Sequence, residues 1–394
     1  MQPNHTITLL GLPEFNAVPM IETNSSIFLR IEKNSMAELC PCCGATSRKI
    51  HDRRKQPLKD LPLRNKQLIL VLIKRRFRCP NCNKVFIESY QSISRYQRMT
   101  IRLIEHITKD ATRLTFKAAA VANGVSSHTA RSLFISKANR LVVDKVAPSV
   151  LAMDEFAVKK GKGENKYNLA IAVPSERRLL DILPDRRQAS VEAYLNSLVD
   201  KQNVKVMVID MWRPYKRATE KTLPRAAIVV DKFHVIRNVM WALDRVRRRI
   251  VEGDRDLRKR LKRSRYLLLK NYDDLDNDGR AKLIELLECS EELKQTYWFK
   301  EWFRVWYHEK DPASAAYYLD DWLANIRRSE IKEMLYVANT VDYWKQEILN
   351  YFTHRLTTGF LEGTNNKIKT IKRMAYGFRT PGILRAKVLL ADAL

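Results

Sequence analysis

The sequence has no apolar stretch long enough to cross a membrane. Its densest apolar run, residues 68–73, has the length of a β-strand, whereas a membrane-spanning helix needs about 20 consecutive apolar residues. The N-terminus also lacks the basic start and the apolar block of a signal peptide. We therefore expect a protein that is not bound to a membrane, and we place it in a reducing cytoplasm because its six cysteines are expected to be thiols.

Acidic residues are few compared with basic residues. The 394-residue chain contains 44 Asp and Glu but 72 Lys and Arg, and its formal net charge is +28. This excess is unusual for an enzyme of small neutral substrates. It favours nucleic acid as the partner, ahead of an acidic membrane surface.

Cysteine is also rare, and four of the six cysteines are spaced for metal binding. Cys40 and Cys43 form one Cys-x-x-Cys turn, and Cys79 and Cys82 form another. In both turns Pro follows the first Cys, and Gly or Asn follows the second; Gly and Asn tolerate positive φ, which lets backbone amides turn towards the thiolates. Because four thiolates form a closed tetrahedral site, we predict one structural Zn²⁺ in a zinc ribbon over residues 38–92. The alternative is a set of unligated buried thiols.

Residues 115–134 have the pattern of a helix-turn-helix. Ala120 precedes Gly124 by four positions, and a small residue with a Gly lets two helices cross closely. We predict a DNA-binding domain over residues 93–145, with an ordinary helical hairpin as the alternative. The residues expected to face a major groove from the second helix are His128, Thr129 and Arg131.

Two aspartates lie in or at the end of short apolar runs that are typical of β-strands. Asp154 lies within residues 150–158, and Asp210 ends residues 204–210. An Asp beside apolar neighbours is costly to bury unless it is paired or bound to metal. Glu155 is a poor substitute for Asp154, because successive strand residues face opposite sides of a sheet.

The order of the expected elements is that of a ribonuclease H-like mixed sheet within a multidomain α/β protein. Three strands in hairpin order are followed by alternating helices and strands. The expected strands cover residues 150–158, 167–174, 179–183, 204–210 and 226–230, with helices over residues 190–200 and after Pro214. The aromatic-rich residues 250–345 are expected to form a large helical insertion.

Residues 360–373 form a basic segment with helical periodicity and one carboxylate, Glu362. In a helix, positions three, four, seven and eleven residues later share its face. These positions hold Asn365, Asn366, Lys369 and Arg373. Such a face suits a metal ion and a phosphodiester, although an isolated Glu on a surface helix is the alternative. Together with Asp154 and Asp210, Glu362 is expected to hold two Mg²⁺ ions.

Two further groups of residues have two interpretations each. Asp231 and His234 follow the last expected strand, where they either assist the reaction or cap the following helix. Residues 245–270 contain twelve Arg and Lys against three acidic residues, which indicates a track for DNA phosphates or else a solvated face. We select Arg258, Arg260 and Arg263 as the DNA-binding candidates of this run.

Several motifs together resemble those of the bacterial insertion-sequence transposases of the ISL-three (ISL3) family. The resemblance covers roughly Cys40 to the C-terminus. The motifs are the two cysteine turns, Arg-Arg-Phe-Arg-Cys-Pro-Asn-Cys from Arg75, Met-Asp-Glu-Phe from Met153, Val-Ile-Asp-Met-Trp-x-x-Tyr from Val208, Asp-Lys-Phe-His from Asp231, and Glu-Gly-x-Asn-Asn-x-Ile-Lys-x-Ile-Lys-Arg-x-Ala-Tyr-Gly-Phe-Arg from Glu362. The last of these is the most specific.

The resemblance implies a DDE triad of Asp154, Asp210 and Glu362 with Mg²⁺ or Mn²⁺ as cofactor. It also implies double-stranded DNA as substrate, namely the terminal inverted repeats of an element and a target, and we expect a homodimer on that DNA. The expected domains are 1–37 (unknown role), 38–92 (zinc ribbon), 93–145 (helix-turn-helix), 148–249 (catalytic core, first part), 250–345 (helical insertion) and 346–394 (core, second part). Rival functions are a transposase-derived repressor and a structure-selective nuclease.

Overall fold

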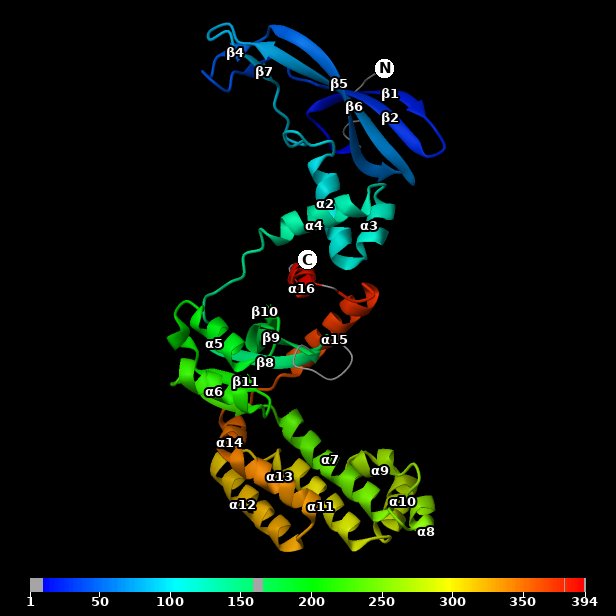
Figure 1. Ribbon diagram of the computed structural model, residues 1–394, viewed down its shortest axis with the longest axis vertical. Coiled ribbons are helices and arrows are strands. Elements are labelled where there is room, and N and C mark those ends of the chain that lie inside the picture. Colours follow the sequence, from blue (N-terminus) through cyan, green and yellow to red (C-terminus); the bar gives the residue numbers. More distant parts are fainter. Residues whose placement is uncertain (1–9, 159–165, 379, 393–394) are drawn as a thin grey trace. The chain divides into compact units, whose positions relative to one another are not determined.

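The computed structural model describes residues 10–158, 166–378 and 380–392, which form two compact units (Figure 1). Unit 1 combines Met1–Leu141 with Ile371–Leu394, and unit 2 is Val142–Thr370. Within the described ranges, no helix is both long and apolar enough to cross a membrane. Each unit is described by itself below.

Unit 1 begins with a five-stranded sheet. Its order is β1-β2-β6-β5, and β7 pairs with the end of β6. The strands are β1 (Phe15–Glu22), β2 (Ser26–Lys33), β5 (Ile50–Leu63), β6 (Lys66–Arg78) and β7 (Val85–Ile87); β3 (Glu38–Leu39) and β4 (Thr46–Ser47) form a separate pair. Alternate residues of β6, Leu68, Leu70 and Leu72, are buried in one apolar cluster, as the period of two in a strand requires.

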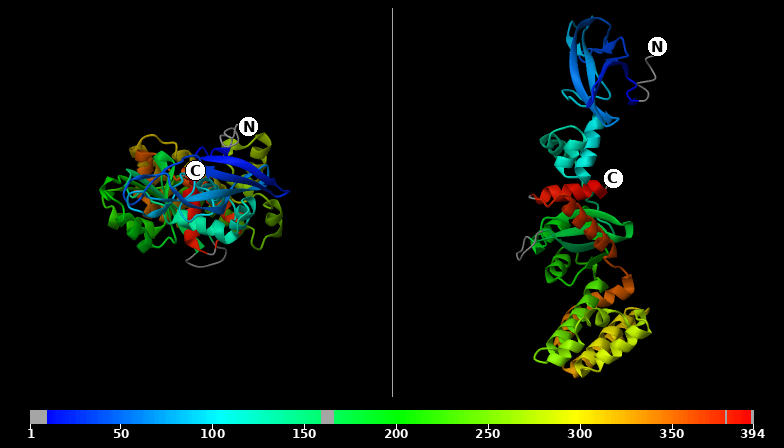
Figure 2. Two further views of the ribbon diagram at one scale, coloured as in Figure 1. Left: turned by 90° about the horizontal axis from the view of Figure 1, so that it is seen from above. Right: turned by 90° about the vertical axis from the view of Figure 1, so that its right-hand side faces the viewer.

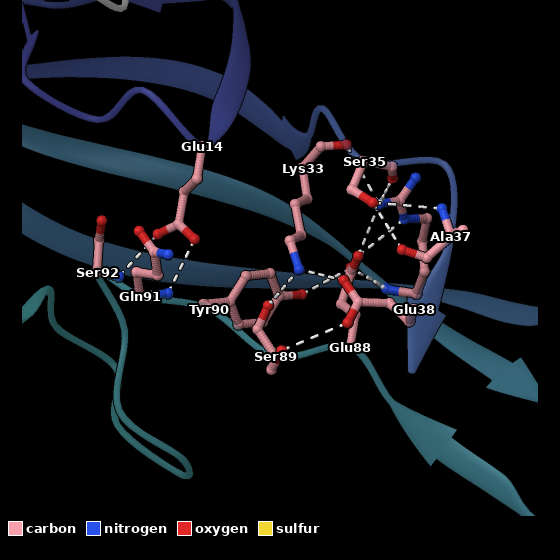
Figure 3. Close-up of polar contacts among 11 residues, drawn as sticks. Glu14, Lys33, Ser35, Ala37, Glu38, Glu88, Ser89, Tyr90, Gln91 and Ser92 are labelled. Carbon is pink, nitrogen blue, oxygen red and sulfur yellow. Dashed lines mark hydrogen bonds and ion pairs between the residues drawn. The ribbon is translucent and has the colours of Figure 1, made fainter. Parts of the chain in front are cut away.

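A buried ion pair lies near the end of β6. It joins Arg75 of this strand to Glu88, the residue that follows β7. The Arg75 Nε and a terminal nitrogen donate to Glu88 Oε2 at 2.9 and 2.8 Å, and both side chains are almost fully buried. Arg75 also donates to the carbonyl of Ser35 at 2.7 Å. Tyr90 Oη donates to Glu88 Oε1 at 2.7 Å (Figure 3). Because each charge keeps several hydrogen bonds, removing either partner should destabilise this region strongly.

Three helices follow the sheet, and each begins at a hydroxyl cap. They are α2 (Ile101–Arg113), α3 (Phe116–Ala122) and α4 (Ser127–Ala138), capped by Thr100, Thr115 and Ser126. Gly124, between α3 and α4, has φ 61°, and a Cβ there would lie 2.1 Å from Gln67 Nε2. The Gly124 carbonyl accepts from Lys59 Nζ. The turn of the predicted helix-turn-helix is therefore attached to the sheet.

The C-terminal helix, α16 (Pro381–Asp392), completes the apolar core of these helices. Ala386 and Leu390 share a buried cluster with Phe134 of α4. Lys387 is buried beside them; its Nζ donates to the carbonyl of Leu114, and burial lowers the pKa of Lys387 to about 8. The structure thus groups α16 with unit 1, whereas the sequence interpretation assigned residues 346–394 to the core of unit 2.

Unit 2 is built on a mixed five-stranded sheet of order β10-β9-β8-β11-β12. The strands are β8 (Val150–Ala157), β9 (Tyr167–Val173), β10 (Arg178–Leu183), β11 (Val206–Ile209) and β12 (Ala227–Val230), with α5 (Gln188–Asn196) and α6 (Arg213–Thr222) between them. β8, β9 and β10 are antiparallel neighbours, whereas β11 runs parallel to both β8 and β12. The strands are largely buried, as parallel strands covered on both faces are.

The rest of unit 2 is helical. The helices are α7 (Lys232–Ile250), α8 (Arg255–Arg260), α9 (Arg265–Leu269), α10 (Asn277–Leu287), α11 (Glu291–Trp306), α12 (Pro312–Ser329), α13 (Lys332–Tyr343), α14 (Lys345–His354) and α15 (Gly359–Met374), of which the last enters unit 1 at Ile371. α7 packs against α11 and α13 (Figures 1 and 2). Phe303 and Trp306 of α11 and Trp322 of α12 are buried.

Candidate functional site

The four predicted zinc ligands of unit 1 converge. The Sγ atoms of Cys40, Cys43, Cys79 and Cys82 all lie within 4.8 Å of one another. The structure confirms positive φ at both predicted turn positions, 74° at Gly44 and 59° at Asn83. The N–H group of each of these residues donates a hydrogen bond to the carbonyl of the first Cys of its turn. The local sequence therefore forms both halves of the site.

The negative charges of four thiolates at this site need a cation to balance them. A hydrogen bond from the N–H of Ala45 and contact with the Cys79 thiol lower the pKa of Cys43. The N–H of Lys84 also favours the Cys82 thiolate, but burial and the other thiols outweigh it and raise the pKa of Cys82 to about 12. Four thiolates thus repel one another unless a divalent ion is present, and this donor set fits Zn²⁺.

In unit 2, three aspartates come together at one edge of the sheet. Asp154 lies near the end of β8, and Asp210 and Asp231 directly follow β11 and β12. The register places Val208 of β11 beside Ala152 and Ile209 beside Val230. Because β8, β11 and β12 are parallel, the carboxyl ends of β11 and β12 bring Asp210 and Asp231 beside Asp154, which lies within β8 two residues beyond its last pair with β11.

The helix α15 brings the remaining carboxylate to this edge. Asn365 is buried, and its Nδ2 donates to Asp154 Oδ2 at 2.7 Å. Glu362 is exposed one turn earlier and lines, with Asp154 and Asp210, a cavity of about 560 Å³. Asn366 and Lys369 line it as well, whereas Arg373 does not.

The cavity is electrostatically unfavourable for its own carboxylates. Burial, followed by the charges of Glu155 and Asp154, raises the pKa of Asp210 to about 7. Burial also raises the pKa of Asp154 to about 6. Asp210 Oδ1 is buried and has no hydrogen-bond partner among the described residues. Oxygen donors that repel one another and lack partners fit a divalent cation such as Mg²⁺.

The expectation that Glu155 faces away from this site is wrong. Glu155 lines the same cavity as Asp154, and its charge raises the pKa of Asp210. The last residue pair between β8 and β11 is Ala152 with Val208, so the edge of the sheet is open beside Glu155 and its long side chain reaches the cavity. Arg186 holds the Glu155 carboxylate at 2.6 Å.

Of the two roles considered for Asp231 and His234, the structure shows the helix cap, which Asp231 provides. Asp231 caps α7 through the N–H of Phe233 and accepts from Thr358 Oγ1. His234 Nε2 lies 3.8 Å from Asp154 Oδ1. His234 Nδ1 lies 2.6 Å from a guanidinium nitrogen of Arg237, whose charge, together with burial as the larger cause, lowers the pKa of His234 to about 4. The neutral ring therefore accepts at Nδ1 and presents Nε2–H towards Asp154.

Sequence reasoning missed several residues of this site, among them Phe233, Arg237, Trp241 and Thr358 in the lining of the cavity, and Arg186, which binds Glu155. Arg237 was detectable in principle, because it lies three residues after His234 on the same helix. The contacts of Arg186 with Glu155 and of Thr358 with Asp231 join segments far apart in the chain. No local pattern indicates such contacts.

The candidates for DNA contact outside the cavity lie on helices or directly after one. His128 and Arg131 are exposed on α4, whereas Thr129 is half-buried and lines a groove with Lys59 of β5. In unit 2, exposed basic side chains follow α7. They include the selected Arg258, Arg260 and Arg263.

Comparison with known proteins gives consistent similarities. Residues 151–388 match a transposase family of the ISL3 DDE type, and residues 37–82 match the zinc finger of the transposases of IS204, IS1001, IS1096 and IS1165. The chain is 32% identical over 363 residues to the transposase for insertion sequence element IS1001 of Bordetella parapertussis, which covers 90% of this chain and 88% of that protein. It is 25% identical over 269 residues to the transposase for IS1557 of Mycobacterium tuberculosis, covering 62% of this chain and 60% of that protein.

Proposed function

Because the chain belongs to the ISL3 family of DDE-type transposases, enzymes that catalyse DNA transposition, we propose that it cuts the ends of its own insertion sequence and joins them to target DNA. Asp154, Asp210 and Glu362 form the proposed triad. The observation that carries this proposal is their convergence on one cavity from two strands and a helix. We place the activity in the bacterial cytoplasm, where the chromosome lies.

We further propose that the sheet of unit 2 is ribonuclease H-like. The order β10-β9-β8-β11-β12, with the first three strands antiparallel and the last two parallel to β8, supports this assignment. The helices from α8 to α13 then form an insertion between β12 and α15, which carries Glu362. The domain limits given above remain predictions.

Asp154, Asp210 and Glu362 are the carboxylates that would hold two Mg²⁺ or Mn²⁺ ions. Such ions activate an attacking oxygen and stabilise the leaving oxygen of a phosphodiester. Asn365 fixes the orientation of Asp154 through its 2.7 Å hydrogen bond, and His234 Nε2–H faces the other oxygen. We assign the binding of DNA phosphate to Asn366 and Lys369, which also line the cavity.

DNA-end recognition is assigned to unit 1. The zinc ribbon and the three helices form one compact unit, and Lys59 and Gln67 hold the turn between α3 and α4 against the sheet. We therefore propose that ribbon and helix-turn-helix bind the terminal inverted repeats as one body, with His128 and Arg131 exposed for contact. Pairing of two ends requires at least a homodimer during the reaction.

The test uses the full-length protein, Mg²⁺ and duplexes with the inverted repeats that flank its gene. We expect a nick at each end, followed by joining of the freed 3′ hydroxyl to target DNA. Nicking without joining favours the structure-selective nuclease. Tight binding to the ends without a cut in Mg²⁺ or Mn²⁺ favours the repressor.

A further inference from the structure

One face of α7 brings two exposed aromatic residues and an arginine to the catalytic cavity. Phe233, Arg237 and Trp241 are spaced four residues apart and therefore share a helix face. All three line the cavity that contains the triad. Phe233 is 51% exposed and Trp241 is 46% exposed, so the rings are not simply core residues of the helix.

Among the residues that the structure describes, none forms a direct ion pair with the positive charge of Arg237. One terminal nitrogen contacts His234 Nδ1 at 2.6 Å, while Nε is buried and has no hydrogen-bond partner in the described part of the chain. The guanidinium lies 5.0 Å from the centre of the Trp241 ring and 5.7 Å from that of Phe233. These rings fix the position of the charge without supplying an acceptor for its N–H groups.

The chemistry of this face matches a nucleotide. A guanidinium with free donors binds a phosphate, and an exposed aromatic ring stacks on a base whose face is not covered by a neighbouring base. Inside a duplex both base faces are covered, so the base must be unpaired or displaced. The triad lies in the same cavity, which limits the nucleotide to the immediate neighbourhood of the bond that is cut.

Resting on the transposase function proposed above, we propose that Phe233, Arg237 and Trp241 form a binding subsite for an unpaired nucleotide next to the cleaved bond. Arg237 donates to its phosphate, and Trp241 stacks on its base, with Phe233 closing the other side of the guanidinium. Nothing in the family match or in the local sequence motif assigns such a site. Arg237 is accordingly a residue that contacts substrate.

The experiment uses full-length protein and terminal-repeat duplexes nicked at the transferred strand, with 2-aminopurine at the first nucleotide on one or the other side of the nick. A 3′-dideoxy end blocks the reaction in the fluorescence arm. Because 2-aminopurine stacked in a duplex is already quenched, we expect the displaced probe to stay quenched on the Trp241 ring of the unmodified protein and to brighten in Trp241→Ala. Trp298→Ala, which removes a Trp of similar exposure (47%) on α11, is the matched control and should quench normally.

A second arm follows joining of a reactive 3′ end. Arg237→Ala should slow it on the order of 100-fold, while Arg217→Ala on the exposed surface of α6 should not change it. An abasic nucleotide at the quenched position should slow the unmodified protein roughly 10-fold and leave Trp241→Ala unaffected, because stacking is then already absent. Trp241→Leu retains apolar volume at this position and serves as the second variant, in case Trp241→Ala misfolds.

Unchanged quenching in both Trp241 variants overturns the proposal, and so does a joining defect in Trp241→Ala that is equally large on normal and abasic DNA. If the unmodified protein joins no ends at all, the transposase function fails instead. The fluorescence arm then still decides whether α7 binds an unpaired nucleotide.

Discussion

The thiolate site of unit 1 and the carboxylate cavity of unit 2 differ in the hydrogen bonds that the protein supplies to the groups that would bind metal. The cysteines lie in two short turns whose backbone N–H groups support them. In contrast, Asp210 is buried with an unpaired oxygen beside other carboxylates. This is the difference expected between a closed structural metal site and, as proposed above, an open site whose repelling carboxylates bind ions and substrate.

The largest effect is expected from the open site. Asp210→Asn or Glu362→Gln should reduce both nicking and joining of a pre-nicked end by more than about 100-fold, the upper range for changes that only surround a metal ligand. Binding of the ends should persist, since unit 1 is unaltered. Gel assays of nicking, joining and binding measure all three, with Glu220→Gln on α6 as an exposed control. Near-normal joining by Asp210→Asn would remove this Asp from the triad.

At the closed site, the expected loss is one of structure. Cys79→Ser should release zinc, unfold about residues 38–90 and abolish specific end binding, because a four-thiolate site contributes folding free energy locally. Unit 2 should keep its fold. Metal analysis and limited proteolysis check this, and Cys289→Ser, outside the cluster, should retain zinc. Purified, reduced protein without zinc would contradict the assignment.

The raised pKa values of the carboxylates in the cavity predict how the stability of the protein depends on pH and on metal. The pKa values of Asp154 and Asp210 are raised to about 6 and about 7, so the folded protein keeps protons that the unfolded chain releases near pH 4. The stability of metal-free protein should therefore fall as pH rises from about 4 to 7, by about 1.4 kcal/mol per pKa unit. Thermal melts with and without Mg²⁺ test this. Asp210→Asn should remove most of the slope, and a slope unchanged in this variant would contradict it.

A smaller effect is expected where α16 joins unit 1. Leu390→Ala removes a side chain from the cluster formed with α2 and α4, and it should destabilise unit 1 by about 2–4 kcal/mol. End binding should then fail at a lower temperature while the unfolding of unit 2 is unchanged. Denaturant unfolding monitored separately in each unit distinguishes these results. Val121→Ala, at a 76% exposed position of α3 in the same unit, is the control and should change stability little.

The smallest effect is expected at Glu155. This residue lies in the cavity but is held by Arg186, so Glu155→Gln should slow joining roughly 10-fold rather than abolish it. It should also lower the pKa of Asp210, because it removes a neighbouring negative charge. A pH profile of joining that shifts to lower pH supports this. A loss as large as that of Asp210→Asn would make Glu155 a metal ligand.

Sequence patterns were sufficient wherever the determinant is local. The two cysteine turns, the positive φ at Gly44 and Asn83, and the strand positions of Asp154 and Asp210 follow from residue type and spacing. The hairpin order of three strands, and then the alternation of helices and strands, predicted the sheet of unit 2. In each case a few neighbouring residues restrict the backbone.

Contacts between distant segments were decided only by the tertiary structure. The end of β11 beside β8 opens the edge of the sheet and lets Glu155 into the cavity. The α16 helix packs in unit 1 because its apolar residues fit those of α2 and α4, and spacing in the chain does not specify which surface a helix covers. Asn365 meets Asp154 across 211 positions. Local spacing thus determined which groups carry the chemistry, while long-range packing determined their partners, because hydrophobic burial is non-directional and depends on shape.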